Sequence, residues 1–297
     1  MNIRTHLALG RVSNLPTIWT NVLAAGALAG AAFPSPGWLP VLMAMSLFYI
    51  AGMYYNDACD AEHDKQHQPH RPIAAGLINR GTVEAYACAY AIVGFLLIYT
   101  ARMSAPLAQQ SASMGWLLSV SCLLLLIVLY NQHHKSNPLS PLLMAACRAM
   151  VLISVSLTLT AMLPKALLLA VLSGLCWVIG LTYFAKHEKS ISASTTLLDK
   201  WPLAMLAIPV VVGLLLSLSN ALILIPLFIL IPVVAFAYAR ITRGMPAEKG
   251  QAIAIMIAAI CLVDGLFLTW MWDLSGAMVS LTAFALTLLL QRWVSGT

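Results

Sequence analysis

The chain has 297 residues, of which 61% are hydrophobic and only 9% are charged, and its mean hydropathy is +0.88. A soluble domain carries about 25% charged residues, so this composition excludes an ordinary soluble protein. The net charge of +6 does not indicate nucleic acid as a partner, because basic cytoplasmic loops give a membrane protein the same sign. The six cysteines show no spacing typical of disulfides or metal ligands.

Apolar segments long enough to cross a bilayer follow one another along the whole chain. The expected spans are residues 17–33, 38–56, 82–101, 114–131, 139–161, 165–184, 201–218, 221–240, 250–271 and 275–293. Only a short link, 272–274, joins the last two, so nine spans are an alternative to ten. We expect an all-α polytopic membrane bundle with a single domain over 1–297, in two helical halves of about 1–135 and 136–297.

Charge asymmetry predicts the orientation of the bundle. With the N-terminus in the cytoplasm, most of the 16 Lys and Arg fall on the cytoplasmic side, as the positive-inside rule requires. The outer connections, such as 102–113, are short and nearly uncharged. The polar start, residues 1–16, lacks the apolar core of a cleavable signal. We expect an integral, multi-pass protein of a bacterial inner membrane, with its active site facing the cytoplasm.

Three acids follow directly on the second expected span. Asp57, Asp60 and Asp64 are spaced i, i+3 and i+7, so a continuing helix places them on one stripe. Acids grouped beside a bilayer are usually retained because a cation binds there, and oxygen ligands suit Mg²⁺. A solvated acidic loop is the alternative. The pattern favours these three residues as catalytic ligands of Mg²⁺.

A basic turn follows the acids. Pro69 and Pro72 predict that the helix ends here, which allows Arg71 to fold back toward the carboxylates. A guanidinium suits bidentate binding of phosphate oxygens. Mg²⁺ on carboxylates beside an arginine is typical of a diphosphate site.

The run Asn56-Asp57-x-x-Asp60-x-x-x-Asp64, followed by Arg71-Pro72-x-x-x-Gly76, resembles the first aspartate-rich motif of the UbiA superfamily of intramembrane prenyltransferases. The resemblance extends over most of the chain. It implies Mg²⁺-dependent transfer of a prenyl group from a prenyl diphosphate, with Asn56 and Arg71 among the substrate-binding residues. The membrane lipid is then an expected partner, and the acceptor is a small polar or aromatic molecule.

Two further segments are similar to the same family. Asn21 in the first span matches a position that the family associates with the diphosphate. The run from Tyr130 to Lys135 resembles the family's Tyr-x-x-x-Lys-Arg element, with His134 in place of the Lys. The resemblance therefore implies that Tyr130, His134 and Lys135 bind substrate.

The family's second aspartate motif is eroded in this chain. At the end of the sixth span, Tyr183 and Lys186 are followed by a single acid, Glu188. The resemblance makes Glu188 a catalytic metal ligand, and Tyr183 and Lys186 substrate-binding residues. Thr-Tyr-x-Ala-x-x-Glu and Ala-Cys-Arg also resemble the UbiA-like proteins of the ebo clusters, which implies a cyclitol or other polyol as acceptor rather than an aromatic ring.

Arg148 and Asp264 are expected inside the membrane. Arg148 lies about 13 Å along the fifth span, where a charge is costly unless it faces a polar cavity. We expect it to line a central cavity and bind substrate; snorkelling to the interface is the alternative. Asp264 is expected to be a structural acid with a partner. Two other readings of the chain stay open: a membrane transporter, and a UbiA-like protein that binds prenyl diphosphate without catalysis.

Overall fold

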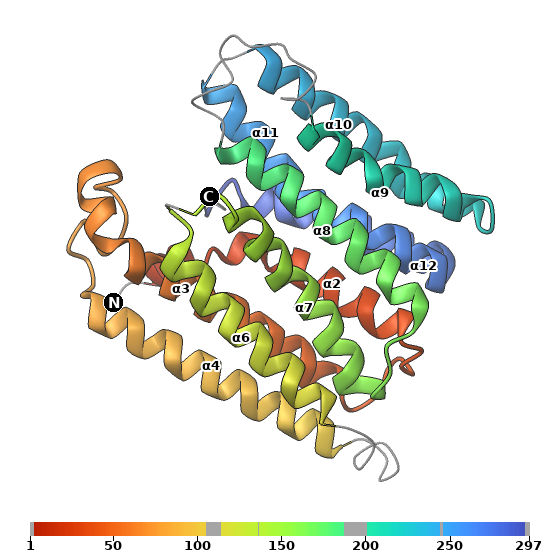
Figure 1. The fold of residues 1–297 in the computed structure, drawn as a ribbon, viewed down its shortest axis with the longest axis horizontal. Helices are drawn as coiled ribbons and strands as arrows, with labels where there is room; N and C mark the ends of the chain where they lie inside the picture. Colours follow the sequence, from red (N-terminus) through yellow and green to blue (C-terminus); the bar gives the residue numbers. More distant parts are fainter. Residues whose placement is uncertain (1–2, 105–113, 136, 187–200, 244–245, 295–297) are drawn as a thin grey trace.

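The computed structural model describes residues 3–104, 114–135, 137–186, 201–243 and 246–294. Every regular element in these ranges is a helix. The helices are α1 (Ile3–Leu9), the 3-10 turn η1 (Val12–Asn14), α2 (Leu15–Leu28), α3 (Trp38–His67), α4 (Arg80–Met103), α6 (Gly115–His133), α7 (Ser140–Thr160), α8 (Lys165–Lys186), α9 (Trp201–Ser217), the 3-10 turn η4 (Ala221–Ile223), α10 (Leu224–Arg243), α11 (Pro246–Ala258) and α12 (Ile260–Leu290). Figure 1 shows them side by side in one bundle, from α4 at one edge to α10 at the other.

The described helices have the length and apolarity of membrane spans. Six segments can cross a bilayer by these criteria, namely Trp38–His67, Arg80–Met103, Gly115–His133, Ser140–Thr160, Lys165–Ala185 and Gly250–Leu290. Two apolar segments, Ala204–Ser217 and Ala221–Phe236, are shorter. Large apolar side chains such as Phe228, at 80% exposure, cover the outside of the bundle. Lipid rather than water suits that surface, and the expected all-α membrane bundle is confirmed.

The last apolar segment, Gly250–Leu290, is a hairpin rather than one rod: α11 and the first part of α12 form one arm, and the rest of α12 forms the other. Trp272 and Asp273 have non-helical backbone angles, and Asp273 has φ 50°. Beyond this break, Gln291 donates to the Ala254 carbonyl (3.3 Å), so the two arms run antiparallel. A Cβ on Gly276 would lie 2.1 Å from the Leu268 carbonyl oxygen, so the turn requires a glycine. The structure thus has the break expected at 272–274.

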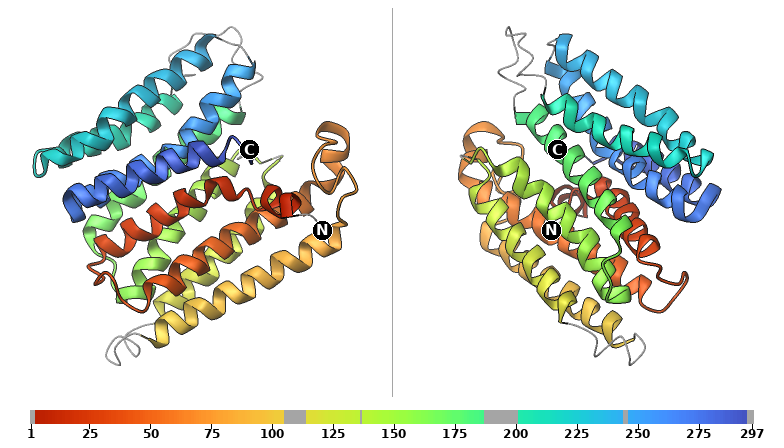
Figure 2. Two further views of the ribbon diagram at one scale, coloured as in Figure 1. Left: turned by 180° about the vertical axis from the view of Figure 1, so that it is seen from behind. Right: turned by 45° about the vertical axis from the view of Figure 1, so that its right-hand side comes forward.

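The ends that are expected to face the cytoplasm gather at one end of the bundle. The last residues of α3, α6 and α8 and the first of α4 lie there, together with both termini (Figures 1 and 2). Because alternate connections meet at this end, basic residues far apart in sequence become neighbours. The side of the membrane that it faces stays a prediction.

Two boundaries differ from the prediction. The first span was expected at 17–33, but α2 ends at Leu28, since the chain turns at Gly30 with φ 73°. Arg102 was expected in an outer loop, but α4 continues to Met103 and buries Arg102 at 0% exposure. Helix length set by packing against α3, rather than by the polarity of one residue, explains this second difference.

Candidate active site at the end of helix α3

Helix α3 carries the three acids, because it continues without a break past the apolar segment to His67. The expected continuous helix is therefore confirmed, and Asp57, Asp60 and Asp64 are all buried, at 5%, 7% and 3% exposure. The helix ends two residues before Pro69, as the sequence predicts. We call Asp57, Asp60 and Asp64 the carboxylate stripe.

The stripe separates into a pair and a single acid. Seven residues on a helix return to nearly the same face, roughly 20° apart, whereas Asp60 lies about 40–60° to one side. Asp57 and Asp64 accordingly share one partner, Arg71, while Asp60 faces the end of α6. Within the described ranges, no three His, Cys, Asp or Glu side chains are close enough to hold a metal ion together. The expected three-acid site is thus divided into two parts.

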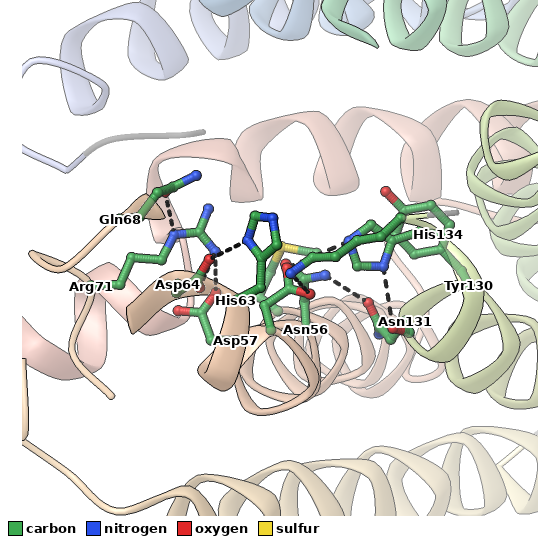
Figure 3. A network of polar contacts seen from close by, with 12 residues as sticks. Asn56, Asp57, His63, Asp64, Gln68, Arg71, Tyr130, Asn131 and His134 are labelled. Carbon is green, nitrogen blue, oxygen red and sulfur yellow. Dashed lines mark hydrogen bonds and ion pairs between the residues drawn. The ribbon is translucent and has the colours of Figure 1, made fainter. Parts of the chain in front are cut away.

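Arg71 folds back from the turn after α3, as its position between two prolines predicts. Its Nη1 lies 3.3 Å from Asp57 Oδ1 and 3.1 Å from Asp64 Oδ2. Its Nε donates to Gln68 Oε1 (2.7 Å), which fixes the plane of the guanidinium. Figure 3 shows this arrangement, with His63 beside Asp64. A positive group therefore already occupies the place between two carboxylates, which shows that this pair accommodates a cation.

The end of α6 supplies the partners of Asp60. Lys135 Nζ lies 2.8 Å from Asp60 Oδ1, and His134 Nε2 lies 3.5 Å from Asp60 Oδ2. Tyr130 stacks on the His134 ring with 5.2 Å between centroids. The structure therefore brings Tyr130, His134 and Lys135 to the carboxylate stripe, and Figure 3 shows Tyr130 and His134 there.

Arg11 and Asn131 also contact this site, although they were not among the predicted site residues. Arg11 Nη2 lies 3.2 Å from both Asp57 Oδ1 and Asn56 Oδ1. Asn56 in turn donates to Asn131 Oδ1 (3.1 Å), and Asn131 donates to the Gly52 carbonyl, which joins α6 to α3. The only sequence signal for Arg11 is a basic residue just before the first span. Its contact with α3 spans 46 residues and follows from no local pattern.

An apolar cavity of ≈ 200 Å³ begins at this cluster and extends into the bundle. Arg11, Asn56 and Tyr130 line its polar end. Its other walls are mainly apolar and include Met45, Met53, Leu123, Ile127, Met144, Val151, Val178 and Leu181. Polar and charged side chains therefore lie next to an apolar wall in one cavity.

Arg148 lines the same cavity, in agreement with the expectation from its depth in the span. Its guanidinium donates to the Thr17 hydroxyl (3.2 Å) and to the Thr17 carbonyl, and lies 3.8 Å from Asp264 Oδ2. Asp264 also accepts from Thr20 Oγ1 at 2.8 Å and from the amide of Asn21 at 3.2 Å. The expected partner of Asp264 is thus present.

Some predicted site residues lie away from the stripe. Asn21 is 1% exposed and is directed to Asp264 rather than to Asp57. Tyr183 donates to the Pro138 carbonyl at 3.3 Å, so it connects α8 to the loop before α7. Lys186 is the last residue of α8, and Glu188 lies outside the described residues.

Comparison with known proteins gives the same fold and a family. The chain resembles a solved structure of digeranylgeranylglyceryl phosphate synthase, with 17% identity, a TM-score of 0.60, and coverage of 89% of this chain and 96% of that one. It also resembles a UbiA homologue from Aeropyrum pernix K1, with 15% identity, a TM-score of 0.63, and coverage of 87% and 97%. At such identities these likenesses show the fold alone. A search of the curated proteins found no match.

The family assignment is based on a match over most of the sequence. The model of the UbiA prenyltransferase family matches residues 15–251, a range that contains the carboxylate stripe, Arg71, Lys135 and Arg148. This chain therefore belongs to the UbiA prenyltransferase family.

Proposed function

We propose that the chain transfers a prenyl group from a prenyl diphosphate to a small polar acceptor, in a reaction that depends on Mg²⁺. The observation that carries this proposal is a buried carboxylate stripe beside an apolar cavity of ≈ 200 Å³, whose wall includes Arg11, the partner of Asp57, and Asn56. Such a pairing suits a substrate with an ionic head and a hydrocarbon tail. The family supports prenyl transfer in general.

Asp57 and Asp64 are the proposed Mg²⁺ ligands nearest to Arg71, and Asp60 is the third. The donor set fits the ion, because Mg²⁺ prefers carboxylate oxygens and completes its shell with water and phosphate oxygens. The Arg71 guanidinium between Asp57 and Asp64 supports a cation position there. Bound Mg²⁺ would supply charge neutralisation for the departing diphosphate.

Basic residues around the stripe are proposed to bind the diphosphate. Arg11, Arg71 and Lys135 lie within 3.3 Å of a stripe oxygen. One planar guanidinium group can donate two hydrogen bonds to phosphate oxygens. These hydrogen bonds become stronger as negative charge develops on the leaving group. These three side chains would hold the diphosphate and stabilise it while the bond from carbon one to oxygen breaks.

The apolar cavity is proposed to hold the first isoprenoid carbons. Methionines at positions 45, 53 and 144 line it, and their flexible thioethers adapt to an irregular hydrocarbon. A dry wall also keeps water from the allylic cation that forms as diphosphate leaves. The acceptor then bonds to carbon one and loses a proton, for which Asp64 or Glu188 is the proposed base.

The second half of the bundle is proposed to complete the site. Glu188 would add a fourth metal ligand, and Lys186 and Tyr183 would bind substrate at the same membrane face. The favoured acceptor is a polyol such as a cyclitol, with an aromatic ring as the other candidate. We place the site at the cytoplasmic face of a bacterial inner membrane.

The proposal is tested with the purified protein, Mg²⁺ and geranylgeranyl diphosphate. We expect release of inorganic diphosphate when a polyol-containing cell extract is added, and none when EDTA is present. Binding of the donor without release in any extract would favour a non-catalytic member of the family. If the protein neither binds nor consumes the donor, prenyl transfer is excluded and transport becomes the better account.

A further inference from the structure

Basic side chains from three different segments of the chain neutralise the carboxylate stripe. Arg11, just before η1, and Arg71, in the turn after α3, contact Asp57, and Lys135, just after α6, contacts Asp60 at 2.8 Å. Arg71 also contacts the third acid, Asp64. The three acids thus face three permanent cations. A divalent cation added to this cluster would leave excess positive charge unless an anion came with it.

Arg71 occupies the position that a bridging metal ion would need. One atom, Nη1, contacts Asp57 Oδ1 at 3.3 Å and Asp64 Oδ2 at 3.1 Å. A cation held by both carboxylates would take the place of the Arg71 guanidinium, so the two would compete for Asp57 and Asp64. Arg71 is 18% exposed in its side chain and lies on a turn, so it can withdraw without moving a helix.

Arg11 contacts the same oxygen of Asp57 as Arg71 does. Its backbone is left-handed, with φ 41° and ψ 48°. This conformation is uncommon for a residue other than glycine, and such residues concentrate at ligand sites. The side chain contacts both Asn56 and Asp57 and also lines the apolar cavity. Arg11 therefore stands between the stripe and the cavity, where the proposed donor would place its diphosphate.

We infer that Arg11 and Arg71 are exchangeable counter-ions. They neutralise Asp57 and Asp64 in competition with a divalent cation, and they transfer to the diphosphate oxygens when the cation takes over the carboxylates. The inference rests on the proposed function, since it requires a diphosphate ligand. Its consequence is linked binding: the divalent cation binds weakly alone and strongly with the diphosphate, because the arginines then gain new anionic partners.

The test measures two affinities that should change in opposite directions. In Arg71→Gln, the affinity for Mg²⁺ alone, measured by calorimetry in detergent, should rise about tenfold, because a positive charge a few ångströms from the ion is removed. The affinity for inorganic diphosphate at saturating Mg²⁺ should fall about tenfold, because a phosphate-binding guanidinium is lost. A merely structural arginine would weaken both.

One variant serves as a control, and a second repeats the test at another residue. Lys65→Gln removes the same charge from α3, but Lys65 pairs with the exposed Glu62 (2.8 Å) rather than with the stripe. It should leave both affinities within about twofold. Arg11→Gln should repeat the opposite changes of Arg71→Gln, which covers the case that one variant does not fold.

The outcomes separate the inference from the proposed function. If Mg²⁺ affinity is unchanged or reduced in both folded arginine variants, while the wild type binds Mg²⁺ with diphosphate and turns over donor, the inference is overturned and prenyl transfer stands. If the wild type binds no diphosphate at saturating Mg²⁺, both are overturned. The exchange is supported if the arginine variants, but not Lys65→Gln, bind Mg²⁺ more tightly and diphosphate more weakly than the wild type.

Discussion

Two clusters of buried charge occupy neighbouring parts of the bundle, and they are built differently. At the stripe, the partners of the acids are long side chains that keep some exposure, 18% for Arg11 and for Arg71 and 37% for Lys135. Around Asp264, the partners are the short Thr20 and Asn21 at 1% exposure, besides Arg148.

The contrast indicates different tasks. Long, partly exposed partners can leave a carboxylate without opening the bundle, so the stripe can exchange its own cations for a ligand. Partners within α2 cannot leave Asp264 without moving that helix. We therefore expect the stripe to serve binding and catalysis, and the pair of Arg148 and Asp264 to fix the packing of α2, α7 and α12 beside the cavity.

The largest expected effect is on catalysis. Asp60→Asn should lower the rate of diphosphate release by about 10³-fold, because it removes a proposed Mg²⁺ ligand and so weakens the electrostatic stabilisation of the departing group. The melting temperature should change little, since the amide keeps the shape of the side chain and the partner Lys135 is 37% exposed, so its charge can be solvated by water. Glu62→Gln is the matched control on the same helix, and it should keep wild-type turnover because Glu62 is exposed and pairs with Lys65. Full activity in Asp60→Asn would refute the assigned role of the stripe.

A smaller effect, on stability, is expected at the second cluster. Asp264→Asn leaves Arg148 without a negative partner and should reduce the free energy of unfolding by about 3 kcal/mol. Thermal unfolding in detergent measures this change. Removing the charge of both residues, in Arg148→Gln with Asp264→Asn, should recover most of the loss. Asp273→Asn, at the exposed turn of the same helix, is the control and should be near neutral. Equal loss in the single and double variants would contradict a charge pair.

The smallest expected effect is on stability at an exposed ion pair, which serves as a reference for the two buried clusters. Lys65 and Glu62 lie 2.8 Å apart, with side-chain exposures of 54% and 77%. Lys65→Gln should change the free energy of unfolding by less than about 0.5 kcal/mol, because water screens such pairs. A change as large as that of Asp264→Asn would show that burial does not distinguish the clusters.

Local spacing predicted much of the site. A continuing helix put the three acids on one stripe, and two prolines predicted the turn that returns Arg71. The resemblance added His134 and Lys135, which the structure places on Asp60. The stripe and the turn that carries Arg71 each involve residues close together in sequence, so spacing alone predicts them. The contact of His134 and Lys135 with Asp60 joins two different elements, and no spacing predicts it.

Tertiary packing decided the rest. The contact of Arg11 with Asp57 and the contacts of Thr20 and Asn21 with Asp264 join residues 46, 244 and 243 positions apart. No periodicity encodes which helices become neighbours across such distances. The division of the stripe likewise depends on which basic residues approach α3 from other elements, and the burial of Arg102 depends on where α4 packs.

Crystals grown with Mn²⁺ and inorganic diphosphate give the most direct measurement of the central claim, through anomalous scattering of the metal. We predict an anomalous peak about 2 Å from carboxylate oxygens of Asp57 and Asp64, with Arg71 moved from these oxygens onto the diphosphate. Bound diphosphate with no metal at these acids, and with Arg71 still between Asp57 and Asp64, would contradict the account.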